Sequence, residues 1–136
     1  MENAIDMLLA ADAGVLSAEQ TEDVEIPRLT RALGAPFMVT VKSVAPERMD
    51  EINDLCLRMT KRGKYTGVDL GKMKMLTLCD GIASPDLKNA ELLKKFGAAT
   101  PKELIGRLFR AGEITRLYEK IQQLSGFDVD ADEIKN

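Results

Sequence analysis

The chain contains no histidine and no tryptophan, and only two cysteines occur among its 136 residues. Without histidine, nucleophilic sites of the Ser-His or Cys-His type are excluded. Cys56 and Cys79 form no CxxC pair, so a zinc site would lack its preferred ligands. Both lie within apolar helical patterns, and we expect free, buried thiols. We therefore predict no catalytic, cofactor-binding or metal-binding residues, and a protein that is not an enzyme.

Long apolar runs are missing as well. No stretch approaches the roughly 18 residues that a membrane-spanning helix needs. The acidic N-terminus has no basic region of the kind that opens a signal peptide. We therefore expect a cytoplasmic protein without a membrane partner. Because only 4% of the residues are aromatic, the core must be built from Leu, Ile, Val, Met and a few Phe.

The charges are distributed unevenly along the chain. Residues 1–25 carry seven acidic residues and no Lys or Arg, and residues 128–136 carry four acidic residues and one Lys. The segment between them holds 18 basic and 11 acidic residues, so a basic body is flanked by two acidic arms. Such arms serve solubility in one interpretation. In the other, an arm screens a basic surface until a partner displaces it.

The first third of the chain indicates short elements. Residues 3–11 predict a short helix with Ile5, Leu8 and Leu9 on one face, and nine residues are marginally helical alone, so this helix needs a partner surface. Residues 14–23 have the composition of a linker. Residues 24–26 precede a proline and predict an edge strand, and alternation over residues 37–41 predicts a second strand. The two strands would form a ribbon that must lie against helices.

From Pro46 onward the apolar spacing is helical. We expect a helix from Pro46 through Met59 that ends at residues 61–64, and a second helix from about residue 69 to residue 80. Residues 88–96 predict a short helix. Thr100-Pro-Lys-Glu103 has the pattern of a capping box and predicts the start of another. Residues 113–124 predict the last helix, with an apolar stripe from Ile114 to Leu124.

These elements predict a mainly α fold: an irregular bundle of four to six helices with a small two-strand β-ribbon near the N-terminus. We expect three parts: a flexible acidic arm with a short amphipathic helix (1–23), a single globular helical domain (24–127) and an acidic disordered tail (128–136). Asp50, Glu51 and Asp54 alternate with the apolar stripe of their helix. We expect them to face water, where their pKa values are not tuned for acid–base catalysis.

The basic region 61–74 raises an alternative function. It contains Lys61, Arg62, Lys64, Lys72 and Lys74, and a small nucleic-acid-binding or regulatory protein could use such a cluster. Tyr65 is the one aromatic residue there, and the chain carries a net charge of −3. No basic recognition helix is apparent, so this interpretation is disfavoured.

Several stretches in register carry a resemblance to a known family. They are Ile26-Pro-Arg-Leu29, Pro85-Asp-Leu-Lys-Asn89, residues 92–97, Thr100-Pro-Lys-Glu-Leu104, Gly112-Glu-Ile114 and residues 117–127. Their order and spacing, from about residue 24 to residue 127, resemble the XkdN-like tail assembly chaperones of phages and prophages of Gram-positive bacteria. One position departs from the pattern, because Ala111 stands where proline is expected.

The resemblance implies a small helical protein that acts during tail assembly in the host cytoplasm and is absent from the mature virion. It would bind the tape measure protein, with the tail tube protein as a candidate second partner, and a homo-oligomer stays open. The family supplies no catalytic residues and no cofactor. From the residues themselves we predict partner contacts at Ile5, Leu8 and Leu9 of the arm. We add Met73 and Met75, because methionine suits an adaptable apolar surface, although both could equally fill the core.

Overall fold

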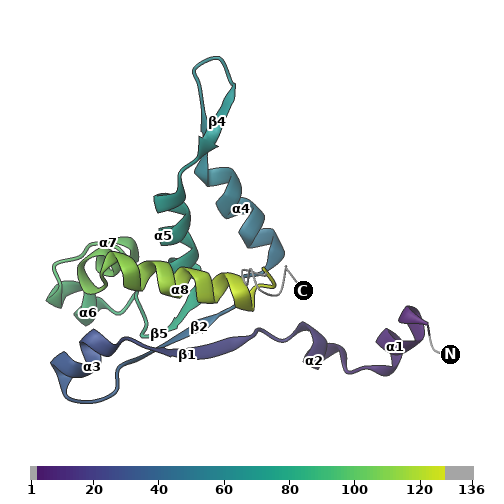
Figure 1. Ribbon diagram of the computed structural model, residues 1–136, viewed down its shortest axis with the longest axis horizontal. Helices are drawn as coiled ribbons and strands as arrows, with labels where there is room; N and C mark the ends of the chain where they lie inside the picture. The colour runs from purple at the N-terminus through teal and green to yellow at the C-terminus, as the bar shows by residue number, and fades with distance from the viewer. Residues whose placement is uncertain (1–2, 128–136) are drawn as a thin grey trace, which may run out of the picture.

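A computed structural model describes residues 3–127 of the chain. Within this range the helices are α1 (Ala4–Ala10), α2 (Ala13–Ser17), α3 (Pro27–Leu33), α4 (Pro46–Cys56), α5 (Leu70–Gly81), α6 (Ala90–Lys95), α7 (Pro101–Leu108) and α8 (Ala111–Leu124). The strands are β1 (Thr21–Glu25), β2 (Met38–Lys42), β3 (Leu57–Met59), β4 (Tyr65–Val68) and β5 (Ile82–Ser84). Figure 1 shows a helical body above a sheet, a hairpin that projects from the body, and an N-terminal arm that leads away from it.

The sheet of the body is antiparallel with the order β1-β2-β5. Val24 lies opposite Val39, and Val39 and Val41 are fully buried, as the alternating pattern of this segment predicts. Helix α3 connects β1 to β2, and the amide of Ile26 donates to the carbonyl of Phe37 at 3.0 Å. The predicted pair of strands is therefore present, but the strand β5 adds a third to it.

Helix α8 lies over this sheet, and α5 packs against α8. Leu78 of α5 and Leu117 and Ile121 of α8 are fully buried, and Leu104 and Ile105 of α7 complete the centre of the core. Thr100 caps α7, since its Oγ1 accepts from the amide of Glu103 at 3.2 Å. The Glu103 carboxylate accepts in return from the amide of Ala99 at 2.7 Å, one residue before the cap. Both hydrogen bonds of the predicted capping box are thus present, except that the Glu103 carboxylate accepts from the amide of Ala99 instead of that of Thr100.

The predicted fold class, a mainly α bundle with a two-strand ribbon, is wrong. The described chain is 56% helical and 16% strand, with a three-strand antiparallel sheet and a separate two-strand sheet, which makes it an α/β mixture. Strand β5 has three residues and directly follows α5. Its pairing with β2 depends on a distant segment, so local periodicity does not reveal it.

The expected end of the helix from Pro46 is also wrong. Helix α4 stops at Cys56, and the chain continues as the β3–β4 hairpin, which holds residues 57–68. Gly63 has a φ of 81°, and the amide of Thr60 donates to the carbonyl of Lys64 at 2.8 Å across the turn. Basic residues followed by glycine are typical of helix ends, but a positive-φ glycine serves a hairpin turn equally well.

The N-terminal segment contains more secondary structure than a linker. Asp12 caps α2 by accepting from the amide of Gly14 at 2.8 Å, and β1 begins at Thr21 rather than at Val24. The sequence contained the signal for α2, because aspartate is a favoured capping residue before a helix. The acidic tail expected at 128–136 lies outside the described residues.

Candidate partner-binding surfaces

The N-terminal arm, defined here as residues 3–20, has every side chain exposed. Its two helices satisfy their first amides with their own caps, since Asn3 accepts from the amide of Asp6 at 2.9 Å and Asp12 accepts from that of Gly14. The arm joins the body where Gln20 and Ser43 exchange hydrogen bonds of 2.8 and 3.1 Å. Figure 1 shows α1 and α2 beyond this joint, away from the body.

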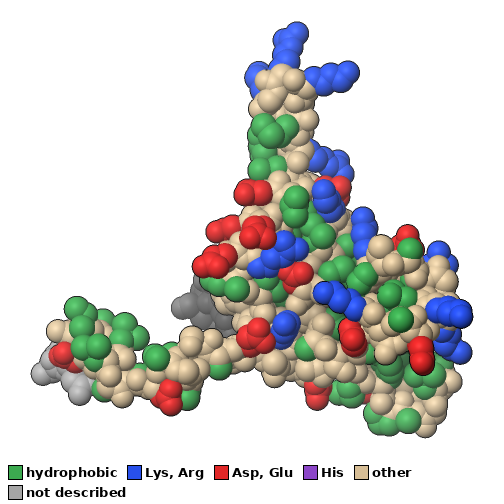
Figure 2. Space-filling model, turned by 180° about the vertical axis from the view of Figure 1, so that it is seen from behind, with side chains coloured by type: hydrophobic (Ala, Val, Ile, Leu, Met, Phe, Trp, Pro, Cys, Tyr) green, Lys and Arg blue, Asp and Glu red, His purple; other side chains and the backbone are tan. Residues whose placement is uncertain are grey.

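The arm carries large apolar side chains on a short acidic scaffold. Ile5, Leu8 and Leu9, the predicted contact residues, are between 64% and 79% exposed, and Figure 2 shows apolar side chains gathered at the end of the arm. The sequence reasoning missed three further exposed apolar residues, namely Met7, Val15 and Leu16. Helices of seven and five residues are too short to hold their conformation alone, so this surface is suited to docking on another molecule.

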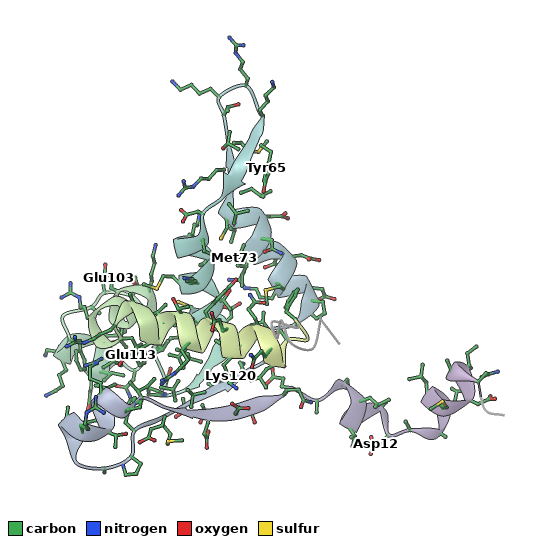
Figure 3. The ribbon with its side chains drawn as sticks, viewed as in Figure 1. Asp12, Tyr65, Met73, Glu103, Glu113 and Lys120 are labelled. Atoms are coloured by element: carbon green, nitrogen blue, oxygen red, sulfur yellow. The ribbon has the colours of Figure 1, made fainter. Side chains whose placement is uncertain are left out.

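A shallow groove lies between α4, α5 and α8. Its volume is about 380 Å³, and Met49, Asn53, Met73, Tyr118, Glu119, Gln122 and Phe127 line it. In Figure 3, Met73 lies between α4 and α5, above α8. A groove with two methionines and two aromatic rings is apolar and can adapt to the side chains of a partner helix.

Met75, the other predicted methionine, does not reach this groove. It is half-buried, and its methyl group lies against Gly106 of α7. The structure therefore separates Met73 from Met75, because residues two apart on a helix point to nearly opposite sides. Both methionines pack against the core, as the alternative interpretation had it, and Met73 also lines the groove.

The β3–β4 hairpin is a surface that the sequence reasoning missed. It rises from the ends of α4 and α5, and the basic cluster Lys61, Arg62 and Lys64 lies at its tip. At its base, the amide of Asp69 donates to the carbonyl of Cys56 at 2.8 Å, and the Asp69 carboxylate lies 3.6 Å from Arg58. That carboxylate also caps α5 by accepting from the amide of Lys72. This bond, more than the nearby Arg58, lowers the pKa of Asp69.

The predicted basic region 61–74 does not form one patch. Lys74 lies on α5 and donates to Thr115 of α8 at 3.1 Å, whereas Lys61, Arg62 and Lys64 are at the hairpin tip. Four acidic residues of α4, among them the predicted water-facing Asp50, Glu51 and Asp54, are exposed beneath the hairpin. An extended polyphosphate backbone would meet these carboxylates as well as the cations.

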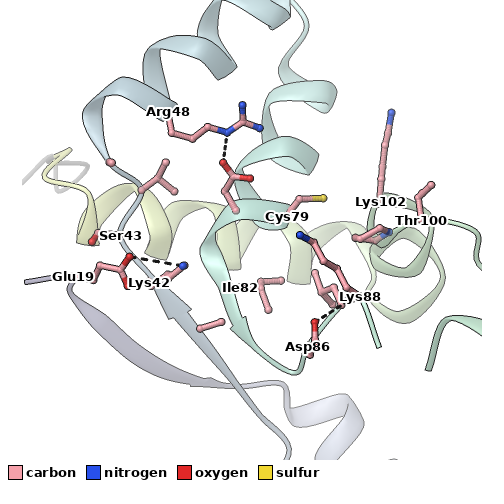
Figure 4. A pocket seen from close by; sticks show the side chains of 16 residues that line it. Glu19, Lys42, Ser43, Arg48, Cys79, Ile82, Asp86, Lys88, Thr100 and Lys102 are labelled. Atoms are coloured by element: carbon pink, nitrogen blue, oxygen red, sulfur yellow. Dashed lines mark hydrogen bonds and ion pairs between the residues drawn. The ribbon is translucent and has the colours of Figure 1, made fainter. Parts of the chain in front are cut away.

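An open hollow of about 700 Å³ is lined by both polar and apolar groups. Figure 4 shows side chains from β2, α4, α5 and the α7 start around it. Four of its charged side chains form two pairs, because Arg48 binds Asp80 and Lys42 lies 3.8 Å from Glu19. The hydrogen bond with Asp80 raises the pKa of Arg48 further, so the cation persists. Burial raises the pKa of the Cys79 thiol, which disfavours a nucleophilic thiolate in this cavity.

Both cysteines are free, as predicted, with Cys56 buried and Cys79 partly buried. Within residues 3–127 the structure groups no three His, Cys, Asp or Glu side chains that could hold a metal ion. Over the same range, no helix is both long and apolar enough to cross a membrane.

Comparisons with known proteins place the chain in a family. A family model described as phage XkdN-like tail assembly chaperone protein matches residues 5–136. A crystal structure titled as that of the protein YqbN has a similar fold, with a TM-score of 0.59 and 19% identity over 87% of this chain and 98% of that chain. No match was found among curated proteins.

Proposed function

Because the chain belongs to the phage XkdN-like tail assembly chaperone family, we propose that it binds the tape measure protein of its phage and keeps it soluble during tail assembly. The family is a class of chaperones and not of enzymes. A tape measure protein is long and helical, so before the tail tube surrounds it, its apolar helix faces are exposed to water. A chaperone for such a client needs adaptable apolar surface rather than reactive groups.

The observation that carries this proposal is the arm. Ile5, Leu8 and Leu9 are exposed on a helix that makes no contact with the body. Full burial of one such side chain contributes about 1.5–3 kcal/mol, so a client that covers all three can offset the cost of ordering the arm. The acidic residues around them, Asp6 and Asp12, favour a client surface that carries Lys or Arg at its rim.

The groove at Met73 is the second proposed contact. It is open between three helices, and an amphipathic helix could place one or two apolar side chains against Met73 and Tyr118. We keep Met75 out of this contact because it packs against α7. The tail tube protein remains the proposed second partner, and we place the activity in the host cytoplasm before the virion is complete.

Co-expression tests this function. The tape measure protein of the same phage is produced with and without the chain, and its soluble fraction is compared. We expect the soluble fraction to rise several-fold with the chain present, and the two proteins to co-purify. An unchanged soluble fraction together with no co-purification would contradict the proposal.

A further inference from the structure

One face of the β3–β4 hairpin is apolar and uncovered. Leu57 lies opposite Val68 and Met59 lies opposite Tyr65, and directly opposed residues of an antiparallel pair share a face. A bulge between Arg58 and Met59 keeps both pairs on the same side. The four side chains are between 40% and 61% exposed. A two-strand hairpin is only marginally stable in water, so such a face is suited to cover by another molecule.

Charges of opposite sign flank this apolar face. Residues 57–68 contain Arg58, Lys61, Arg62 and Lys64 and no acidic residue. Beneath the hairpin, α4 exposes Glu47, Asp50, Glu51 and Asp54. Figure 2 shows three kinds of surface in order from the hairpin tip downward: blue cations at the tip, green apolar groups along the hairpin and red carboxylates below. We call this surface, from the hairpin tip to α4, the flank strip.

We propose that the flank strip binds a helical segment of a protein partner that is apolar along one side, acidic at one end and basic at the other. The acidic end lies against the hairpin tip and the basic end against α4. The 11 residues of α4 span about 16 Å at 1.5 Å per residue. The four residues of strand β4 add about 13 Å at 3.3 Å per residue. A helix of about 20 residues spans about 30 Å, which matches the strip.

The carboxylates of α4 decide against three other occupants. A nucleic acid and an anionic membrane are negative throughout, so either would meet repulsion from Asp50 and Asp54 when it reached the tip cations from this flank. The arm of a second copy is apolar but carries three acidic residues, Asp6, Asp12 and Glu19, and no basic ones. Its carboxylates would be attracted to the cations of the hairpin tip but repelled by the carboxylates of α4. A helix with two oppositely charged ends satisfies both parts.

This inference rests on the proposed function only for the identity of the partner, because a tape measure protein offers long amphipathic helices. The recognition itself is tested with synthetic peptides and the full chain. Three labelled 20-residue amphipathic peptides share one apolar stripe: a two-ended peptide with acids in one half and lysines in the other, a peptide of the same composition with the charges interspersed, and an acidic peptide. Fluorescence anisotropy measures their binding to the wild type and to variants.

We expect the two-ended peptide to bind the wild type at least tenfold more tightly than the interspersed one. K61E/K64E at the tip and D50K/D54K on α4 should each weaken it at least tenfold. The matched control K94E/K95E reverses two exposed cations on α6 and should change binding less than twofold. Because all these residues are exposed, thermal unfolding should show folded variants.

Equal binding of the two-ended and interspersed peptides would overturn the inference. So would binding of the acidic peptide or of a 20-base-pair DNA duplex as tight as that of the two-ended peptide. Self-association that K61E/K64E abolishes, measured by sedimentation, would assign the strip to a second copy instead. If the chain distinguishes the peptides as expected but the wild type does not solubilise the tape measure protein, the inference about the flank strip holds and the proposed function is contradicted.

Discussion

Arg28 and Glu113, 85 positions apart, meet in a two-pronged ion pair that joins α3 to the first turn of α8. The Nε and Nη2 atoms of Arg28 lie 3.0 and 2.9 Å from the two carboxylate oxygens of Glu113, and Nη2 also donates to the carbonyl of Leu108 at 2.8 Å. Glu113 accepts from the amide of Arg110 as well, at 2.8 Å. Two of the stretches that carry the family resemblance, around Arg28 and Glu113, therefore contact each other and are structural.

This pair predicts a pH dependence of stability. The hydrogen bond from Arg28, with the amide of Arg110, holds the pKa of Glu113 below its ordinary value. A carboxyl whose folded pKa is lowered stabilises the fold at pH values above its unfolded pKa, and the contribution is lost as pH falls through the folded pKa. Glu113→Gln should therefore unfold at a lower denaturant concentration than the wild type at pH 7. The difference should shrink as pH falls through the lowered folded pKa of Glu113, since the protonated carboxyl is then as neutral as the glutamine. A difference that stays constant in urea unfolding across an acid titration from pH 7 would contradict this assignment.

The close packing of α5 on α8 predicts an effect of one methyl group. A Cβ added at Gly81 would lie 2.5 Å from Cδ1 of Ile121, which is fully buried. Gly81→Ala should lower the free energy of unfolding by about 1–3 kcal/mol, as overpacking does. Adding Ile121→Val should recover part of the loss by removing that methyl group. Gly112→Ala in α8 is the matched control, because no atom lies within 4 Å of its added Cβ. Chemical denaturation should show the control neutral or stabilised, and equal losses at both glycines would refute the packing argument.

A buried hydroxyl predicts a stabilising substitution. Thr77 on α5 is fully buried, and within the described chain its Oγ1 has no hydrogen-bond partner. Leaving a buried polar group unpaired costs about 1–3 kcal/mol, so Thr77→Val, of nearly the same shape, should raise the free energy of unfolding by about 1 kcal/mol. Thr77→Ser keeps the hydroxyl and loses a methyl group, so it should lower the free energy of unfolding. If Thr77→Val destabilises in urea unfolding, the hydroxyl has a partner in solution.

The arm should affect binding and leave the body unchanged. Ile5→Ser, Leu8→Ser and Leu9→Ser together should shift the free energy of unfolding by less than about 0.5 kcal/mol, because these side chains do not contact the core. The same triple variant should lower the fraction of tape measure protein that co-purifies. Leu33→Ser, at an exposed leucine of α3, is the control and should leave the co-purified fraction unchanged. Loss of thermal stability in the triple variant would show that the arm folds onto the body.

Sequence reasoning succeeded where one helix carries its own signals. Helices α7 and α8 have an N-terminal capping residue or a long apolar stripe within a single segment, and Leu104, Leu117 and Ile121 are buried as expected. It failed where the conformation depends on a distant segment. Met59 continues the helical spacing of Met49 and Ile52, yet it belongs to β3, because the next strand pairs with it across Gly63.

Among the candidate contacts, the sequence indicated the arm residues but not the hairpin face. The exposure of Ile5, Leu8 and Leu9 followed from an apolar face on a helix too short to be independent. The hairpin face was missed because Met59 and Tyr65 become neighbours only after the strands pair. Met73 and Met75 were grouped by their closeness in sequence, but helix geometry sends one to the groove and the other to α7.

Hydrogen exchange in the complex tests the central claim most directly. In the free chain we expect the amides of residues 4–17 to exchange quickly, since both arm helices are exposed. With saturating tape measure protein, these amides should become strongly protected, while those of the α8 core at Leu117 and Ile121 change little. A complex that forms while the arm exchanges as fast as in the free chain would contradict the account.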